Sequence, residues 1–264
     1  MNFENDTNYL DQHFLVDKKV INAFIDAAQF KITDSVVEIG PGKCVLSEII
    51  AKKVANLLLI ESDKRLDYFI NVLIDKYNNT SVVWENALET YIPPCNKIVS
   101  ALPYSITEPF IEKLLRCDFD EGIFIVGNNF ATSVVEKSVS KLSLLTNSFF
   151  NVEKIMEITP DAFDPAPRVM SALIKIKRLD RKELLNDPKM YIMREIFFRR
   201  SSKLKNSLME ALIEYEKTTN DKITKRESKS LIEKFNIDKV TLDKEVEQLS
   251  NEEFKLLYDS IKIK

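Results

Sequence analysis

Histidine, glycine and cysteine are scarce in this sequence of 264 residues, which contains one, four and three of them respectively. His13 is the one histidine in the sequence. A zinc site built from several histidines is therefore excluded, and we expect no metal centre. Cys44, Cys95 and Cys117 share no C-x-x-C spacing. They therefore predict free thiols in a reducing compartment, which we take to be the cytoplasm.

The sequence also lacks long apolar runs and a strong excess of one charge. No run approaches the ~18 residues that a membrane-spanning helix needs, and the N-terminal segment has no signal-peptide character, so we expect no membrane partner. The net charge of −3 is unevenly spread, because residues 181–264 carry 19 basic and 16 acidic side chains. This modest asymmetry does not by itself indicate nucleic-acid binding.

Apolar segments and helical periodicity alternate up to about residue 180, which predicts an α/β fold with a doubly wound, mostly parallel sheet. The expected strands are 35–39, 57–60, 81–84, 97–101, 122–126, 152–158 and 171–176, and the alternation in the last two suits antiparallel pairing. A single helix is expected over 131–150. Beyond Leu179 the strand signals stop, so we expect a sheet domain over 1–180 and a small helical domain over 181–264.

Two of the four glycines lie in the turn Gly40-Pro41-Gly42, directly after the first expected strand of the sheet. Glycines there let the backbone approach a ligand, and Glu61, at the end of the next strand, is placed to accept hydrogen bonds from ribose hydroxyls. Val45 stands where the NAD fingerprint has glycine or alanine, and no P-loop motif is present. A tight turn beside a surface glutamate stays the plain alternative.

A stiff turn follows the expected strand 97–101. Pro103 cannot extend a sheet, and we expect Thr107 to cap the next helix. Tyr104 is then held at the carboxyl end of a strand, where open α/β sheets place their ligands. An aromatic ring beside a backbone carbonyl suits a flat, amino-bearing base. A proline turn with one half-buried tyrosine is the plain alternative.

Seven segments, in chain order, carry a resemblance: 12–17, 38–43, 61–63, 87–88, 102–106, 163–172 and 198–208. Together they resemble the motifs of the ribosomal-RNA adenine N6-dimethyltransferases, the family of the kasugamycin-resistance and macrolide-resistance methylases. The resemblance implies a Rossmann-like class I methyltransferase fold, S-adenosylmethionine as cofactor, and rRNA of the small ribosomal subunit or its precursor as partner. It also implies a monomer.

The resemblance further implies the roles of individual residues. The target adenine would lie between Tyr104 and Phe163, with its N6 amino group near the backbone carbonyl of Leu102. The residues implied in cofactor binding are Gln12, His13, Leu15, Gly40, Gly42, Glu61, Asn86 and Ala101. Those expected to contact RNA are the basic residues of the helical domain, Arg194, Arg199, Arg200, Lys203 and Lys205.

The sequence departs from the family pattern at several positions. Ala101 stands where the family has an asparagine that accepts a hydrogen bond from the target amino group. Cys44 replaces a third glycine, and we expect its side chain to crowd the methionine end of the cofactor. Asn86 replaces an aspartate, and 127–129 replaces a Gln-x-Glu stretch. Two hypotheses follow: an rRNA adenine dimethyltransferase, or a divergent rRNA-binding assembly factor with weak or absent activity.

Overall fold

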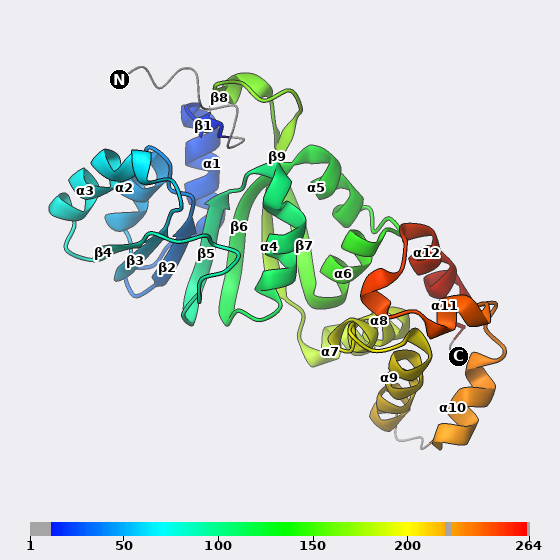
Figure 1. The fold of residues 1–264 in the computed structure, drawn as a ribbon. Helices are drawn as coiled ribbons and strands as arrows, with labels where there is room; N and C mark the ends of the chain where they lie inside the picture. The colour runs from blue at the N-terminus through cyan, green and yellow to red at the C-terminus, as the bar shows by residue number, and fades with distance from the viewer. Residues whose placement is uncertain (1–11, 220–222, 263–264) are drawn as a thin grey trace. The chain divides into compact units, whose positions relative to one another are not determined.

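A computed structural model describes residues 12–219 and 223–262 of the chain (Figure 1). These residues form two compact units. The first contains the chain up to Val135 together with Val152–Lys177, and the second contains Glu136–Asn151 together with the chain from Arg178 onward. A single cut at residue 180 does not describe this division, because the segment Glu136–Asn151 belongs with the C-terminal helices.

The first unit is built on a seven-stranded sheet with the strand order β4-β3-β2-β5-β6-β9-β7. Neighbouring strands are parallel from β4 to β6, and β9 pairs antiparallel with β6. This confirms the predicted doubly wound, mostly parallel sheet. The strand bounds are β2 Ser35–Ile39, β3 Asn56–Ile60, β4 Thr80–Val83, β5 Cys95–Ala101, β6 Phe119–Gly127, β7 Phe150–Ile158 and β9 Ser171–Arg178.

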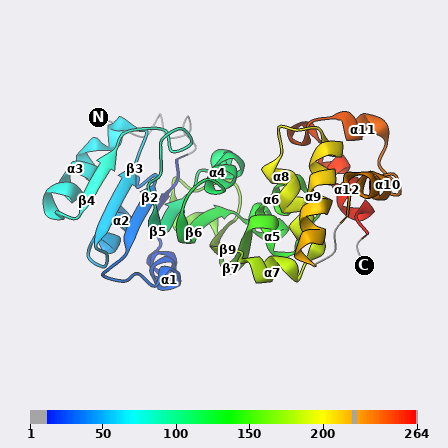
Figure 2. The same ribbon diagram turned by 90° about the horizontal axis from the view of Figure 1, so that it is seen from below.

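Helices cover both faces of this sheet, and Figure 2 shows α1 and α4 on opposite sides of it. Asp17 caps α1 as predicted, since its side chain accepts hydrogen bonds from the backbone N–H groups of Lys19 and Val20. The helices of this unit are α1 Lys18–Ala28, α2 Val45–Ala51, α3 Asp67–Lys76, α4 Thr107–Leu114 and α5 Asn128–Val135, with single turns at Lys64–Leu66, Tyr104–Ile106 and Pro160–Ala162.

Two very short strands form a separate antiparallel pair, β1 Phe14–Leu15 and β8 Phe163–Asp164. Phe14 pairs with Asp164 and Leu15 with Phe163, and Val16 donates a backbone hydrogen bond of 2.9 Å to Ala162. The pair was not expected, because two residues are too few to show a strand periodicity. It joins the N-terminal motif to the motif that begins at Phe163.

Two expected helix boundaries are wrong. The expected helix over 131–150 is interrupted between α5 and α6 (Lys141–Phe149), where Lys137 has a φ of +52° and Ser140 caps α6. Thr107 does not cap α4 but is its first residue, while Ile106 occupies the N-cap position without a side-chain bond. The single turn Tyr104–Ile106 leads directly into α4. A backbone hydrogen bond from Thr107 to the carbonyl of Tyr104 therefore takes the place of a side-chain cap.

The second unit is helical. Beyond Arg178 its described residues contain helices and no strand, which agrees with the periodicity of the sequence. Ile192, Ile196, Leu208 and Phe254 are fully buried between these helices. The elements are α6, α7 Arg181–Leu185, α8 Pro188–Phe198, α9 Leu204–Thr218, α10 Lys225–Ile232, α11 Lys239–Asp243 and α12 Asn251–Ser260. Within the described ranges of the whole chain, no helix is long and apolar enough to span a bilayer.

Candidate active site

A cavity of about 620 Å³ lies at the carboxyl ends of the parallel strands β2, β3 and β5. This volume is within the range of roughly 300–1,000 Å³ that is typical of small-molecule sites. The lining includes every residue expected to bind a cofactor or a target base: Gln12, His13, Leu15, Gly40, Gly42, Glu61, Asn86, Ala101, Leu102, Tyr104 and Phe163. The sheet thus brings together residues that are up to 151 positions apart in sequence.

The turn after β2 approaches the cavity with its backbone. Gly40 and Gly42 have φ values of +62° and +57°, a region that strongly favours glycine. The Gly40 N–H donates to the carbonyl of Ile60 over 2.9 Å, which fixes the turn against β3. Phe14 of β1 covers Gly42, and Lys43 places its ammonium 4.5 Å from the centroid of the Phe14 ring.

Cys44 is not among the residues that line the cavity, which speaks against the expected crowding of a cofactor. It adopts a left-handed conformation with φ +62°, at the N-cap of α2, and its side chain is buried in the apolar core. Burial, with a smaller contribution from the nearby charge of Glu38, raises the pKa of the Cys44 thiol to about 12. The thiol is therefore neutral at physiological pH and packs as a small apolar group.

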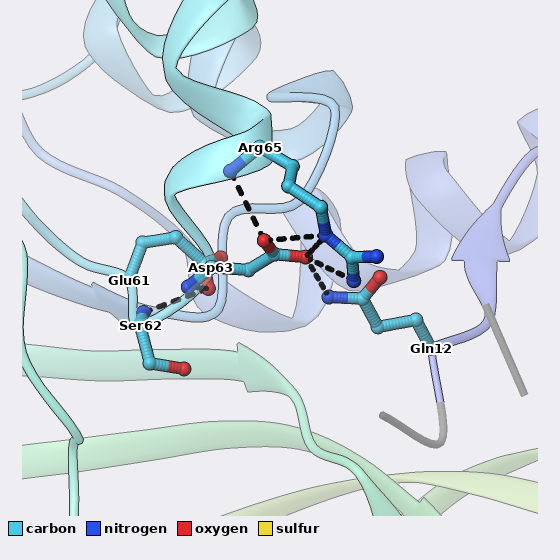
Figure 3. A network of polar contacts seen from close by, with 5 residues as sticks. All are labelled: Gln12, Glu61, Ser62, Asp63 and Arg65. Atoms are coloured by element: carbon cyan, nitrogen blue, oxygen red, sulfur yellow. Dashed lines mark hydrogen bonds and ion pairs between the residues drawn. The ribbon is translucent and has the colours of Figure 1, made fainter. Parts of the chain in front are cut away.

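Glu61 directly follows β3 and lines the cavity, and Figure 3 shows the polar network around it. Its Oε1 accepts backbone hydrogen bonds from Ser62 and Asp63, both 2.8 Å long, and burial raises the pKa of its carboxyl. The next acid, Asp63, accepts hydrogen bonds from Arg65 and from the Nε2 of Gln12, each at 2.9 Å. Gln12 is thereby tied to the loop that carries Glu61.

Glu38 also lines the cavity, although the sequence did not single it out as a site residue. It is only 2% exposed, and its Oε2 has no hydrogen-bond partner among the described residues. Burial raises the pKa of its carboxyl to about 7. A buried carboxylate oxygen beside a cavity suits a cation or an N–H donor. The sequence carried a signal for this role, because Glu38 is the one charged residue in the strand Ser35–Ile39.

His13 and Tyr104 both line the cavity, and we call them its aromatic wall. His13 is stacked on Tyr104 with ring centroids 6.3 Å apart, and its Nδ1 lies 2.7 Å from the carbonyl oxygen of Pro165. Since a carbonyl only accepts, Nδ1 carries the hydrogen in this contact. The Tyr104 hydroxyl contacts the hydroxyl of Ser171. Sequence reasoning missed Ser171 and Pro165 as site-supporting residues, because only the fold brings them to the cavity.

Ala101 and Asn86 stand where the sequence resemblance implies an asparagine and an aspartate. Ala101 ends β5 beside Ile125 and presents no polar side chain to the cavity. The Oδ1 of Asn86 accepts from the backbone of Leu88 over 3.0 Å, and its Nδ2 donates to Glu89 over 3.1 Å. Asn86 is therefore held in a fixed orientation by its own loop.

The five basic residues expected to bind RNA lie in α8, the loop after it and the start of α9. The Arg194 guanidinium lies 5.4 Å from the rings of both Phe149 and Phe198, and burial lowers its pKa. Arg199 forms an ion pair of 2.6 Å with Glu195. Lys203 and Lys205 both contact Asp243. The RNA-binding role of this segment, which includes Arg200, stays a prediction.

Known proteins resemble this chain along most of its length. The family model described as ribosomal RNA adenine dimethylase matches residues 3–262. A probable ribosomal RNA small subunit methyltransferase A from Methanococcoides burtonii is 33% identical over 208 residues, 75% of this chain and 76% of that protein. The protein of the same name from Pyrococcus abyssi is 36% identical over 182 residues, 66% of each chain.

Two solved structures share the fold. A dimethyladenosine transferase from Plasmodium falciparum superposes with a TM-score of 0.63 at 22% identity, covering 93% of this chain and 96% of that one. The 23S rRNA methyltransferase ErmE superposes with a TM-score of 0.58 at 21% identity, covering 94% and 98%. At this identity the two structures support the Rossmann-like methyltransferase fold alone. The match over residues 3–262 goes further, and this chain belongs to the ribosomal RNA adenine dimethylase family.

Proposed function

We propose that this protein transfers methyl groups from S-adenosylmethionine to the N6 atom of an adenine in small-subunit rRNA, and that it adds two of them. The observation that carries the proposal is the shared cavity. One space is lined both by the residues implied in cofactor binding and by those implied in holding the adenine. These residues are far apart in the sequence, from Gln12 to Phe163. The names of the relatives favour rRNA of the small subunit.

The chemistry of the cavity fits the cofactor. S-adenosylmethionine supplies a methyl group bonded to a positively charged sulfur, and it also carries an ammonium group. Glu61 is placed to accept hydrogen bonds from the ribose, while the open backbone at Gly40 permits a close approach. The unpaired buried oxygen of Glu38 favours a positively charged ligand. Asn86 retains an amide oxygen that can accept from the amino group of the cofactor's adenine.

The target adenine has to leave its stack to reach the methyl group, which costs a few kcal/mol. Tyr104 and Phe163 offer the aromatic surfaces that offset this cost by stacking on the base. The Leu102 carbonyl accepts a hydrogen bond from the N6 amino group and so keeps the N6 lone pair directed at the methyl. Because Ala101 adds no side-chain acceptor, the acceleration rests mainly on positioning, and we expect slow transfer.

Contact with RNA is assigned to the basic segment of the helical unit, in particular Arg199, Arg200, Lys203 and Lys205. Each phosphate that these residues neutralise releases counterions, so affinity for RNA should fall steeply as salt rises. The contact between the two lysines and Asp243 makes this segment less positive than its composition suggests. When RNA binds, a phosphate therefore has to replace Asp243 as the partner of Lys203 and Lys205.

The test is methyl transfer from isotope-labelled S-adenosylmethionine to small-subunit particles and to naked small-subunit rRNA. Nucleoside mass spectrometry then separates mono- and dimethyladenine. We expect dimethyladenine with the wild-type protein and none with Tyr104→Ala, which keeps the cofactor loop intact. Tight binding of both cofactor and RNA without any methyladenine would overturn the proposal and leave an RNA-binding assembly factor.

A further inference from the structure

Ser171 lies behind the aromatic wall of the cavity. It is the first residue of β9 and pairs with Gly127, the last residue of β6. Its side chain is fully buried, and it is not part of the cavity lining. Ser171 can therefore touch neither a ligand in the cavity nor the reacting atoms. Any influence on them has to pass through another residue.

The residue in contact with Ser171 is Tyr104, whose hydroxyl meets the serine hydroxyl. Tyr104 begins the single turn Tyr104–Ile106, so its own backbone belongs to a short connecting turn rather than to a strand. Ser171, in contrast, is held in the sheet, and the backbone N–H of Asn128 donates to the neighbouring Met170 over 2.9 Å. The hydroxyl pair thus links a residue on a turn to a fixed point.

Two further residues border the Tyr104 ring. A Cβ built at Gly127 would lie 3.9 Å from the Tyr104 ring, so Gly127 provides a surface without a side chain to clamp it. His13 stacks on the ring with centroids 6.3 Å apart, at an angle of 25° between the planes, which is a loose contact. Stacking on a base is sensitive to the tilt of the aromatic plane.

We propose that Ser171 is a positioning residue that holds the hydroxyl end of the Tyr104 side chain, and so sets where the ring lies when the target adenine stacks in the cavity. The inference rests on the proposed function, since it assumes that Tyr104 receives the base. It adds a supporting residue outside the cavity. The alternative is that the two hydroxyls merely satisfy one another, as buried polar groups generally do.

The experiment compares Ser171→Ala, Tyr104→Phe and the double variant. Ser148→Ala is the matched control, because Ser148 is also fully buried and donates its hydroxyl hydrogen to a carbonyl, that of Leu144. Each protein is assayed for methyl transfer with varied RNA, for cofactor affinity by calorimetry, and for thermal stability. The adenine that the wild type methylates is then replaced by 2-aminopurine, whose fluorescence reports its stacking.

We expect Ser171→Ala and Tyr104→Phe to raise the KM for RNA by a similar factor, about threefold to tenfold, which is the worth of one neutral hydrogen bond. The double variant should show no further increase, because both single changes break the same link. Cofactor affinity should stay at the wild-type value, and 2-aminopurine should stack less well in all three. Ser148→Ala should leave the KM for RNA unchanged.

The inference is overturned if the two single effects multiply in the double variant. It is also overturned if Ser171→Ala lowers cofactor affinity and thermal stability while KM for RNA is unchanged, which is the signature of a purely structural serine. A wild-type protein that never methylates RNA would overturn the proposed function itself, and that failure is visible before any variant is made. Wild-type activity with an unaffected Ser171→Ala variant overturns this inference alone.

Discussion

The ring of Phe14 lies against Gly42 so closely that a Cβ on this glycine would come within 3.1 Å of the phenylalanine Cδ1. The N-terminal strand β1 therefore covers the turn Gly40-Pro41-Gly42 at Gly42. The cover is fixed from two sides, by the pairing of β1 with β8 and by the hydrogen bond from Gln12 to Asp63. A substitution in the turn Gly40-Pro41-Gly42 should therefore also affect Phe163, because β1 pairs with β8.

Alanine substitutions at the two glycines separate backbone strain from this contact. Both glycines have a positive φ. Each alanine variant should therefore lose about 1–2 kcal/mol of folding stability, because a residue with a Cβ is strained in the left-handed backbone conformation. At Gly40 nothing lies within 4 Å of the added Cβ, whereas at Gly42 the methyl has to displace Phe14. We expect Gly42→Ala to bind S-adenosylmethionine clearly more weakly than Gly40→Ala in calorimetry. Equal affinities of the two variants would show that Phe14 moves aside without cost.

The pKa of Glu38, raised by burial to about 7, predicts a pH-dependent stability. The folded state holds this proton up to a higher pH than the unfolded chain does. The contribution of Glu38 is thus fully present below about pH 4.5 and is lost as the pH rises through 7. Each pH unit between these values is worth about 1.4 kcal/mol, so the loss is at most ~3.5 kcal/mol.

Glu38→Gln removes this titration while keeping the shape of the side chain. Urea unfolding between pH 5 and pH 8 should therefore show a smaller loss of stability in the variant than in the wild type. Glu61, whose pKa is also raised by burial, acts in the same direction and remains in both proteins. Parallel curves for the two proteins would mean that Glu38 stays charged throughout this range.

The sheet was predictable because its strands are short apolar runs between turn residues, and burial on both faces permits such runs. The break at 136–140 was not, since the apolar spacing of 131–150 fits one helix and only tertiary packing divides it. The direction of Cys44 depends on its left-handed backbone, which no spacing reveals. Likewise the contact between Tyr104 and Ser171 joins residues 67 positions apart. Local patterns predict elements, while contacts between distant residues arise from the fold.

Glu121 makes the first unit sensitive to acid. It lies 2.8 Å from the Nζ of Lys97, 3.0 Å from that of Lys175 and 2.7 Å from that of Lys177. Burial alone would raise the pKa of its carboxyl, but the three lysines outweigh burial and lower it to about 2. The stability that Glu121 contributes is therefore present above pH 4.5 and is lost as the pH falls toward 2.

Glu121→Gln leaves two largely buried lysines, Lys97 and Lys175, without their carboxylate. Loss of one partner of a buried ion pair typically costs roughly 3–5 kcal/mol. We expect the variant to have a much lower urea midpoint than the wild type at pH 7. This difference should become smaller below pH 4, because the wild type loses the same charge there. Glu157→Gln is the control, because its ion pair with Lys154 is exposed and should cost less than about 1 kcal/mol. Similar midpoints for both variants would contradict the prediction.

Ala101 offers the most direct test of what limits the reaction. It ends β5 at the cavity, next to the Leu102 carbonyl, and has no polar side chain with which to orient an amino group. Ala101→Asn adds an amide oxygen at this position. One oriented polar group at a reacting centre is commonly worth roughly 10²–10³ in rate, so we expect kcat for methyl transfer to rise by at least about tenfold.

The matched control for this change is Ala101→Leu, whose side chain has nearly the same size and shape as asparagine but cannot accept a hydrogen bond. If the missing acceptor limits the reaction, the asparagine variant is faster and the leucine variant is no faster than the wild type. Cofactor affinity, measured by calorimetry, distinguishes a rate effect from a filled cavity. An increase in kcat with both variants would mean that the cavity is too wide around the base. An increase with neither variant would mean that the slow step does not involve the orientation of N6.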